Sequence, residues 1–143
     1  RMIDVNLTGV FHKDQQAVPD MIEAMWGRIV TISSQAAQSD ASDRAHYAAS
    51  KGGVIGLTRS LARELAAHGI TVNTIPPSLV DTPLARSGMA TFAITSLDQM
   101  TGHTPIARAG TPEDIANACE FLCSNKASYI SGQEINVNGG SWM

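Results

Sequence analysis

The sequence is short of cysteine, of charged residues and of long apolar runs. Its two cysteines, Cys119 and Cys123, lie four residues apart in an apolar helical pattern, which favours buried thiols over a disulfide framework. Because no group of cysteines and histidines completes a four-ligand set, we expect no metal site. The 143-residue chain has no run of about 18 consecutive apolar residues, so it predicts no membrane-spanning helix.

Charge also narrows the possible functions. Charged residues make up 16% of the chain and the net charge is −3, so there is no basic surplus of the kind that nucleic-acid binding requires. We expect neither nucleic acid nor a membrane as a partner. The first residues, RMIDVNLTG, lack the zones of a signal peptide, and the sequence therefore predicts a soluble, cytoplasmic protein.

The chain does contain alternating helical and strand-like patterns. Helical spacing occurs in residues 5–25, where Pro19 is expected to kink or divide the helix, in residues 45–68, and after Thr111. Short apolar runs predict strands at residues 28–33, 70–75 and 133–137, and such runs are typical of parallel sheets. This order predicts one α/β domain, residues 1–143, whose parallel sheet has about three strands and flanking helices.

The pattern loosens between residues 78 and 110. This segment is polar, rich in threonine and serine, and has no sustained helical or strand period. Long segments of this kind inside a compact domain are usually functional, and we expect residues 83–110 to form a lid over the substrate. Its larger side chains predict a fairly apolar lid: Met89, Phe92, Ile94 and Met100.

Three side chains with useful chemistry lie around the loop between the first strand and the next helix: Ser34, Tyr47 and Lys51. Tyr47 and Lys51 are four residues apart and therefore share one helix face. An ammonium beside a phenol favours the phenolate, which suits Tyr47 to act as a general acid/base, while Ser34 can hydrogen-bond the same substrate oxygen. Spacing alone leaves another interpretation open, in which Tyr47 is a helix-start aromatic, Lys51 a solvated charge and Ser34 a cap.

Five motifs follow one another along the chain: VNLTG, GRIVTISS, YAASKGGVIGLTRSLARELAAHGITVN, PPSLVDTPL and SGQEINVNGG. Together they resemble the C-terminal part of the short-chain dehydrogenase/reductase family, and the resemblance covers essentially the whole chain. It implies the C-terminal half of a Rossmann-like, doubly wound parallel sheet. It also implies an oxidoreductase that moves a hydride between NAD or NADP and a small-molecule carbonyl or alcohol.

The resemblance implies a role for each matching residue. Tyr47 is expected to be the acid/base, Ser34 to hold the substrate oxygen, and Lys51 to bind the nicotinamide ribose. Asn6 is expected to hold a water that links Lys51 to a proton relay. The turn at residues 76–84 is expected to lie beside the nicotinamide, where four residues bind the cofactor: Pro77, Ser78, Val80 and Thr82.

The sequence also departs from the family. Ser78 and Ala37 stand where the family has glycines. The family's glycine-rich phosphate-binding turn is missing, and GGVIG at residues 52–56 cannot replace it because it lies within a helix. We therefore expect a truncated chain that lacks the N-terminal βαβ half and binds a dinucleotide weakly on its own.

Two hypotheses remain open. In the first, the chain is the catalytic half of an NAD(P)-dependent carbonyl reductase. In the second, it is a non-catalytic α/β fragment with an assembly or structural role. The family usually pairs through the helix that holds Tyr47 and the helix before the catalytic strand, and an unpaired sheet edge favours association, so we expect a homo-oligomer.

Overall fold

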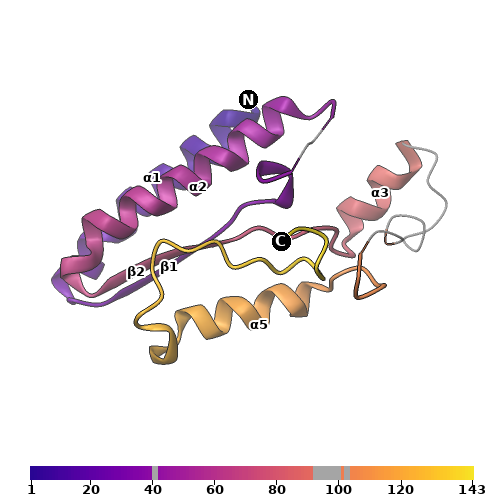
Figure 1. Ribbon diagram of the computed structural model, residues 1–143. Helices are drawn as coiled ribbons and strands as arrows, with labels where there is room; N and C mark the ends of the chain where they lie inside the picture. Colours follow the sequence, from indigo (N-terminus) through magenta and orange to yellow (C-terminus); the bar gives the residue numbers. More distant parts are fainter. Residues whose placement is uncertain (40–41, 92–100, 102–103) are drawn as a thin grey trace.

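The computed structural model describes residues 1–39, 42–91, 101 and 104–143. Its elements form three layers. Helices α1 (Gly9–Glu23) and α2 (Ala45–Leu65) cover one face of a small sheet, and helix α5 (Pro112–Cys123) covers the other face (Figure 1). None of the helices in these described ranges is long and apolar enough to cross a membrane.

Two parallel strands form the centre of the sheet, β1 (Gly27–Ile32) and β2 (Ile70–Ile75). They are in register from the pair Gly27 and Ile70 to the pair Ile32 and Ile75. Every residue of β2 is buried, as expected for a strand that helices cover on both faces. The predicted α/β class and the first two predicted strands are confirmed.

The third predicted strand lies parallel to β2 but is interrupted. It meets β2 and the residues after it at two parallel bridges, Thr74 with Glu134 and Pro77 with Val137. Between these bridges a continuous ladder needs a hydrogen bond from the backbone N–H at position 76. Pro76 has no N–H, and the chain therefore forms separate bridges there instead of a full strand.

Helix α2 connects the two strands and ends at a glycine. The helix continues into a short 3-10 turn, Ala66–His68, and the chain then turns at Gly69, whose φ of 71° lies in the left-handed region. A Cβ atom at Gly69 would approach the Met25 carbonyl oxygen to 2.6 Å, so only glycine fits at this turn. The core under this helix is formed by Ile29, Ala62, Leu65, Ile70 and Val72.

Helix α1 follows a π-helical turn, Asp4–Thr8, and contains Pro19. Of the two predicted effects of Pro19, a kink or a division of the helix, the division is wrong, because α1 continues to Glu23, and the kink stays a prediction. Pro19 and Gln15, four residues before it, are both exposed. The Gln15 carbonyl, which the proline leaves without its helical donor, can therefore bind water.

Helix α5 begins at the predicted Thr-Pro signal with a capping box, in which Thr111 and Asp114 each bind the other's backbone N–H. Its buried side packs Leu122 against Ile75 and Ala127 to form a second core. A narrow buried stripe is typical of a helix that covers one face of a sheet.

One of the two cysteines of α5 lies at the edge of this buried stripe, and the other lies outside it. Cys119 is half-buried, and Cys123 is exposed; both are free thiols. The prediction that both are buried is therefore wrong. Among the described residues, no group of three or more potential metal ligands occurs.

Part of the predicted lid is helical. Helix α3 (Pro83–Thr91) begins after Thr82, whose hydroxyl accepts a hydrogen bond from the Ala85 N–H at 3.1 Å. The same Thr-Pro signal starts α5, so the sequence carried a helix start that the loose periodicity obscured. Met89 lies on α3, whereas three of the predicted lid residues lie outside the described residues: Phe92, Ile94 and Met100.

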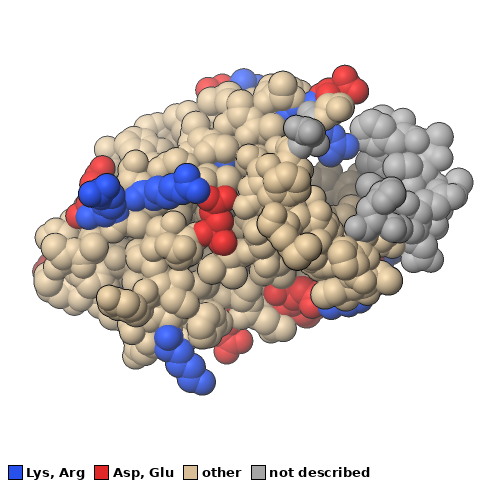
Figure 2. All heavy atoms as spheres, in the orientation of Figure 1, with Lys and Arg blue, Asp and Glu red and all other residues tan. Residues whose placement is uncertain are grey.

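The face drawn in Figure 2 carries few charged side chains, and basic and acidic groups lie beside each other at several points on it. An ion pair joins Arg59 of α2 to Glu134. No extended basic surface is seen among the described residues of this face.

Candidate functional site

A cleft of about 1010 Å³ opens where β1 and β2 end. Residues from the loops after both strands line it, together with the start of α2. Open α/β sheets usually bind their ligands at this edge. The cleft brings together four of the predicted site residues: Ser34, Tyr47, Pro77 and Ser78.

Ser34 lies two residues beyond the end of β1. Its hydroxyl oxygen accepts a hydrogen bond from the Ala36 N–H at 3.2 Å and thereby caps the 3-10 turn Gln35–Ala37. The cap uses the oxygen as an acceptor and leaves the hydroxyl proton able to bind another group. Ser34 is therefore a cap and, at the same time, a potential donor in the wall of the cleft.

Tyr47 and Lys51 lie on one face of the first turns of α2. The Lys51 Nζ atom is 6.0 Å from the centroid of the Tyr47 ring and donates a hydrogen bond to the Ile32 carbonyl oxygen at 2.9 Å. Burial lowers the pKa of Lys51, because the charged form loses hydration. Lys51 is held at the end of β1 by this hydrogen bond, and the interpretation as a freely solvated charge does not fit this geometry.

Asn6 reaches α2 through Ser50, a residue that the sequence reasoning missed. The Asn6 Nδ2 group donates to the Ser50 hydroxyl at 3.2 Å, and this hydroxyl donates to the Tyr47 carbonyl oxygen at 2.7 Å. Asn6 lies in the π-helical turn before α1, and such turns are frequent at functional sites. The sequence did contain a signal for Ser50, because a residue three positions after Tyr47 lies close to it along the helix, on its inner side.

A second buried serine joins the end of β1 to the same turn of α2. The Ser33 hydroxyl donates to the Lys51 carbonyl oxygen at 2.9 Å, and the Ser33 N–H donates to the Ile75 carbonyl oxygen at 2.9 Å. Ser33 is 3% exposed, so this bond is protected from water. The hydroxyls of Ser50 and Ser33 thus bond the backbone carbonyls of Tyr47 and Lys51, respectively.

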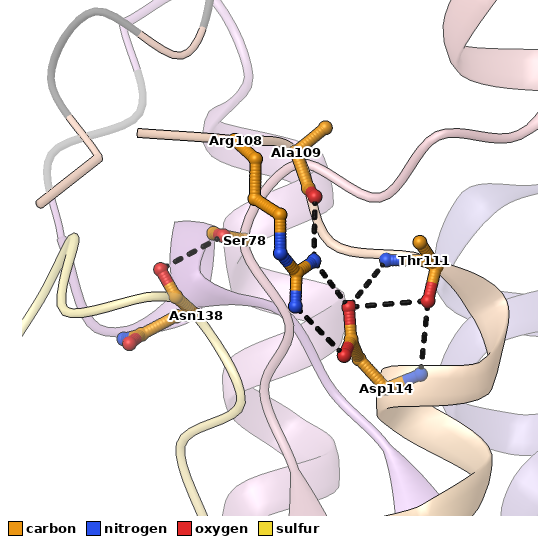
Figure 3. Close-up of polar contacts among 6 residues, drawn as sticks. All are labelled: Ser78, Arg108, Ala109, Thr111, Asp114 and Asn138. Carbon is orange, nitrogen blue, oxygen red and sulfur yellow. Dashed lines mark hydrogen bonds and ion pairs between the residues drawn. The ribbon is translucent and has the colours of Figure 1, made fainter. Parts of the chain in front are cut away.

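Pro77 and Ser78 form the part of the cleft wall that follows β2. The Pro77 carbonyl oxygen accepts a hydrogen bond from the Gln35 N–H at 2.9 Å, which joins the two loops. The Ser78 hydroxyl donates to the Asn138 carbonyl oxygen at 3.2 Å (Figure 3). The Ser78 side chain is thus bonded to the C-terminal turn.

Val80 and Thr82 lie farther along this turn and are not among the described residues that line the cleft. Val80 forms a parallel bridge with Gly110 through the peptide groups of its two neighbours, Leu79 and Asp81. Because these neighbours make the bonds to Gly110, the N–H and C=O of Val80 itself point away from Gly110. The Thr82 hydroxyl oxygen accepts the hydrogen bond that caps α3, so the hydroxyl proton can still be donated to another group.

A smaller hollow of about 360 Å³ lies on the far side of Ser78. Arg108 forms a two-pronged ion pair with Asp114 there, with N to O distances of 2.6 and 3.0 Å (Figure 3). The Arg108 hydrogen bonds, followed by the Thr111 N–H, hold the pKa of Asp114 far below its usual range. These two charges compensate each other, and they fasten the segment before α5 to its first turn.

The chain resembles known proteins over nearly its full length. Residues 1–141 match the family model described as enoyl-(acyl carrier protein) reductase. The 3-oxoacyl-acyl-carrier-protein reductase of Staphylococcus aureus is 44% identical over 142 residues, which cover 99% of this chain and 56% of the relative. The chain therefore spans about half the length of the curated relatives it matches.

Solved structures also resemble this chain over nearly its full length. A short-chain type dehydrogenase/reductase from Mycobacterium ulcerans superposes with a TM-score of 0.88 at 35% identity, over 97% of this chain and 50% of that structure. A 3-oxoacyl-acyl-carrier-protein reductase from Brucella melitensis with bound NAD superposes with a TM-score of 0.85 at 36% identity, over 99% and 50%.

Proposed function

Because this chain belongs to the short-chain dehydrogenase/reductase family, we propose that it carries the catalytic residues of an NAD(P)-dependent oxidoreductase acting on a carbonyl or alcohol. The observation that carries the proposal is the cleft that both Ser34 and Tyr47 line, with the Lys51 Nζ atom 6.0 Å from the centroid of the Tyr47 ring. Both residues line this cleft at the carboxyl edge of the parallel sheet, where open α/β sheets usually bind their ligands.

Each of these residues has a distinct task in the proposed reaction. The Tyr47 hydroxyl gives a proton to the carbonyl oxygen during reduction and takes it back during alcohol oxidation. Ser34 donates a hydrogen bond to the same oxygen and stabilises its developing negative charge. Lys51 lies on the same helix face, with its Nζ atom 6.0 Å from the centroid of the Tyr47 ring. Asn6 is the proposed end of a proton relay toward Lys51, with Ser50 fixing it against α2.

The residues present fit the nicotinamide end of the cofactor. When bound, the nicotinamide carries the hydride that is added to or removed from the substrate carbon. Lys51 offers ammonium protons to the ribose, and Pro77 and Ser78 form the adjoining wall. The Val80 peptide groups and the Thr82 hydroxyl proton offer contacts for the carboxamide. The sequence has no glycine-rich turn for the pyrophosphate, so the fit is limited to this end.

We further propose that residues 1–143 act as one partial domain, that residues 83–110 cover the substrate, and that the protein forms a homo-oligomer. Exposed apolar side chains on α1 and in the turn before it support the last point, with Phe11 42% and Val5 66% exposed. Sedimentation at micromolar concentration should give more than a monomer, and a clean monomer would contradict this part.

The proposed acid/base is tested with the two tyrosines of the chain, in the protein expressed from its full reading frame. Tyr47→Phe should lower kcat/KM for carbonyl reduction by roughly 100-fold or more. Tyr129→Phe is the matched control, because that side chain is fully exposed and should have no effect. Unchanged turnover in Tyr47→Phe would refute the assignment.

The alternative function, a non-catalytic α/β fragment with an assembly role, predicts no nucleotide binding. Titration with NADH and NADPH separates the two proposals. Stoichiometric binding of either nucleotide would count against the alternative, and it would also indicate which cofactor the protein prefers.

A further inference from the structure

We propose that Glu134 is a positioning residue for the proposed reaction. Through Gln38 it holds the turn that carries Ser34, and it thereby fixes where the Ser34 hydroxyl meets the substrate oxygen. The inference rests on the proposed function, since Ser34 is the group that it serves. Glu134 is not among the described residues that line the cleft, and it acts across 96 positions of the sequence.

The turn after β1 is closely bonded within itself. The Ser34 hydroxyl oxygen accepts from the Ala36 N–H at 3.2 Å, and the Ser34 carbonyl oxygen accepts from the Ala37 N–H at 2.9 Å. The carbonyl oxygen of the next residue, Gln35, accepts from the Gln38 N–H at 2.9 Å. Because each of these bonds joins residues that are close in the sequence, a displacement of Gln38 is passed on to Ser34.

Two contacts tie this turn to the segments beside it. At its start, the Gln35 N–H donates to the Pro77 carbonyl oxygen at 2.9 Å. At its end, the Gln38 Nε2 group donates to the Glu134 Oε2 atom at 2.9 Å and to the Asn136 Oδ1 atom at 3.0 Å. The first contact alone leaves the turn able to rotate about one point, and the second contact removes this freedom.

Glu134 is itself held firmly, as a positioning group must be. Its backbone forms a parallel bridge with Thr74, and its segment runs beside β2 (Figure 1). The second oxygen of its carboxylate accepts a hydrogen bond from Arg59 of α2. Its side chain is only 17% exposed. Hydrogen bonds to an ionised group are roughly twice as strong as those between neutral groups, so the Gln38 amide has a strong and fixed acceptor.

Two substitutions at this position separate loss of the contact from its retention. Glu134→Ala removes the carboxylate and leaves Gln38 with Asn136 as its side-chain partner. Glu134→Gln keeps the shape and one acceptor oxygen. In that variant the Gln38 amide can also turn to offer its Oε1 atom, which is buried without a partner, so a contact between the two side chains remains possible in either orientation.

The test measures the reduction of ethyl acetoacetate and of cyclohexanone, with NADH or NADPH, by the protein expressed from its full reading frame. Glu134→Ala should lower kcat roughly tenfold and change KM by less than about threefold, because a displaced donor stabilises the developing charge less well. Glu134→Gln should keep kcat within about threefold of the parent protein. Glu64→Ala is the matched control, because this glutamate is exposed on α2 and should have no effect.

A Ser34→Ala background separates positioning from a general effect on stability. If Glu134 acts through Ser34, Glu134→Ala should lower kcat by less than about twofold once the Ser34 hydroxyl is absent. A loss of folded protein would instead lower the rate equally with and without that hydroxyl. Equal losses in the two backgrounds, or no loss in the parent background, would overturn the inference and leave the proposed function intact.

If neither ketone is reduced, the proposed function fails, and amide hydrogen exchange decides the inference separately. The N–H groups of Ala37 and Gln38 bond within the turn, and in Glu134→Ala they should exchange at least roughly fivefold faster than in the parent protein. The N–H of Val72, which is fully buried in β2, should exchange at the same rate in both proteins. Unchanged exchange in the turn would refute the inference.

Discussion

Ser50→Ala is expected to lower the free energy of unfolding although it removes a single oxygen atom. Ser50 is completely buried. Its hydroxyl accepts from Asn6 at 3.2 Å and donates to the Tyr47 carbonyl oxygen at 2.7 Å. The change therefore breaks two hydrogen bonds at the point where the N-terminal turn meets the helix that carries the proposed acid/base.

The size of the effect can be worked from these two bonds. A hydrogen bond contributes about 1 kcal/mol net, and a buried partner left unsatisfied costs more. Asn6 is only half-buried, so its amide can partly return to water, and the Tyr47 carbonyl lies within the hydrogen-bonded helix. We therefore expect a loss of roughly 2 kcal/mol for the two bonds together.

Urea unfolding followed by circular dichroism measures this loss. With a urea m-value of about 2 kcal/mol/M, the midpoint should fall by roughly 1 M. Ser60→Ala is the matched control, because Ser60 lies on the exposed side of the same helix, and it should change the free energy of unfolding by less than about 0.5 kcal/mol.

A double-mutant cycle with Asn6→Ala isolates the contact itself. The Asn6 and Ser50 substitutions should be non-additive by at least about 0.5 kcal/mol, as expected for two residues that share a hydrogen bond. The reasoning would be refuted by a Ser50→Ala midpoint equal to that of the Ser60→Ala control, or by strict additivity in the cycle.

Two further predictions concern the helix that holds Lys51 and the second core. The pKa of Lys51 in the folded protein lies below its ordinary value of 10.5, so between these two pH values the unfolded chain binds more protons than the folded one. The free energy of unfolding should therefore rise with pH across that window. Urea midpoints measured across the window should show this rise in the parent protein and in Lys126→Met, but not in Lys51→Met. Leu122 is fully buried and Phe121 is 46% exposed, so Leu122→Ala should cost about 3 kcal/mol and Phe121→Ala under about 1 kcal/mol in the same assay; equal costs would contradict the described packing of α5.

The parts of the fold that the sequence predicted well depend on local signals. The second strand was predicted with its observed bounds because Gly69 ends the helix before it and Pro76 follows it. The start of α5 was marked by a hydroxyl, a proline and two acidic residues in succession. Such signals act within a few residues and need no knowledge of the rest of the chain.

The errors arose where a local pattern met a tertiary constraint. Pro19 did not divide its helix, because its side of α1 faces solvent and the freed carbonyl can be hydrated. Cys123 continued an apolar pattern but lies outside the stripe that meets the sheet. The run at residues 133–137 was correctly placed parallel to β2, yet Pro76 interrupts the ladder of its neighbour.

By itself, the sequence determined the α/β class, the family and the presence of Ser34, Tyr47 and Lys51 at the spacings that their proposed roles require. These properties depend on residue types and short separations. Only the tertiary structure decided that Ser34 and Tyr47 share a cleft and that Ser50 joins Asn6 to α2 across 44 positions. The reason is that burial and long-range hydrogen bonds are set by how distant segments pack, which no local pattern encodes.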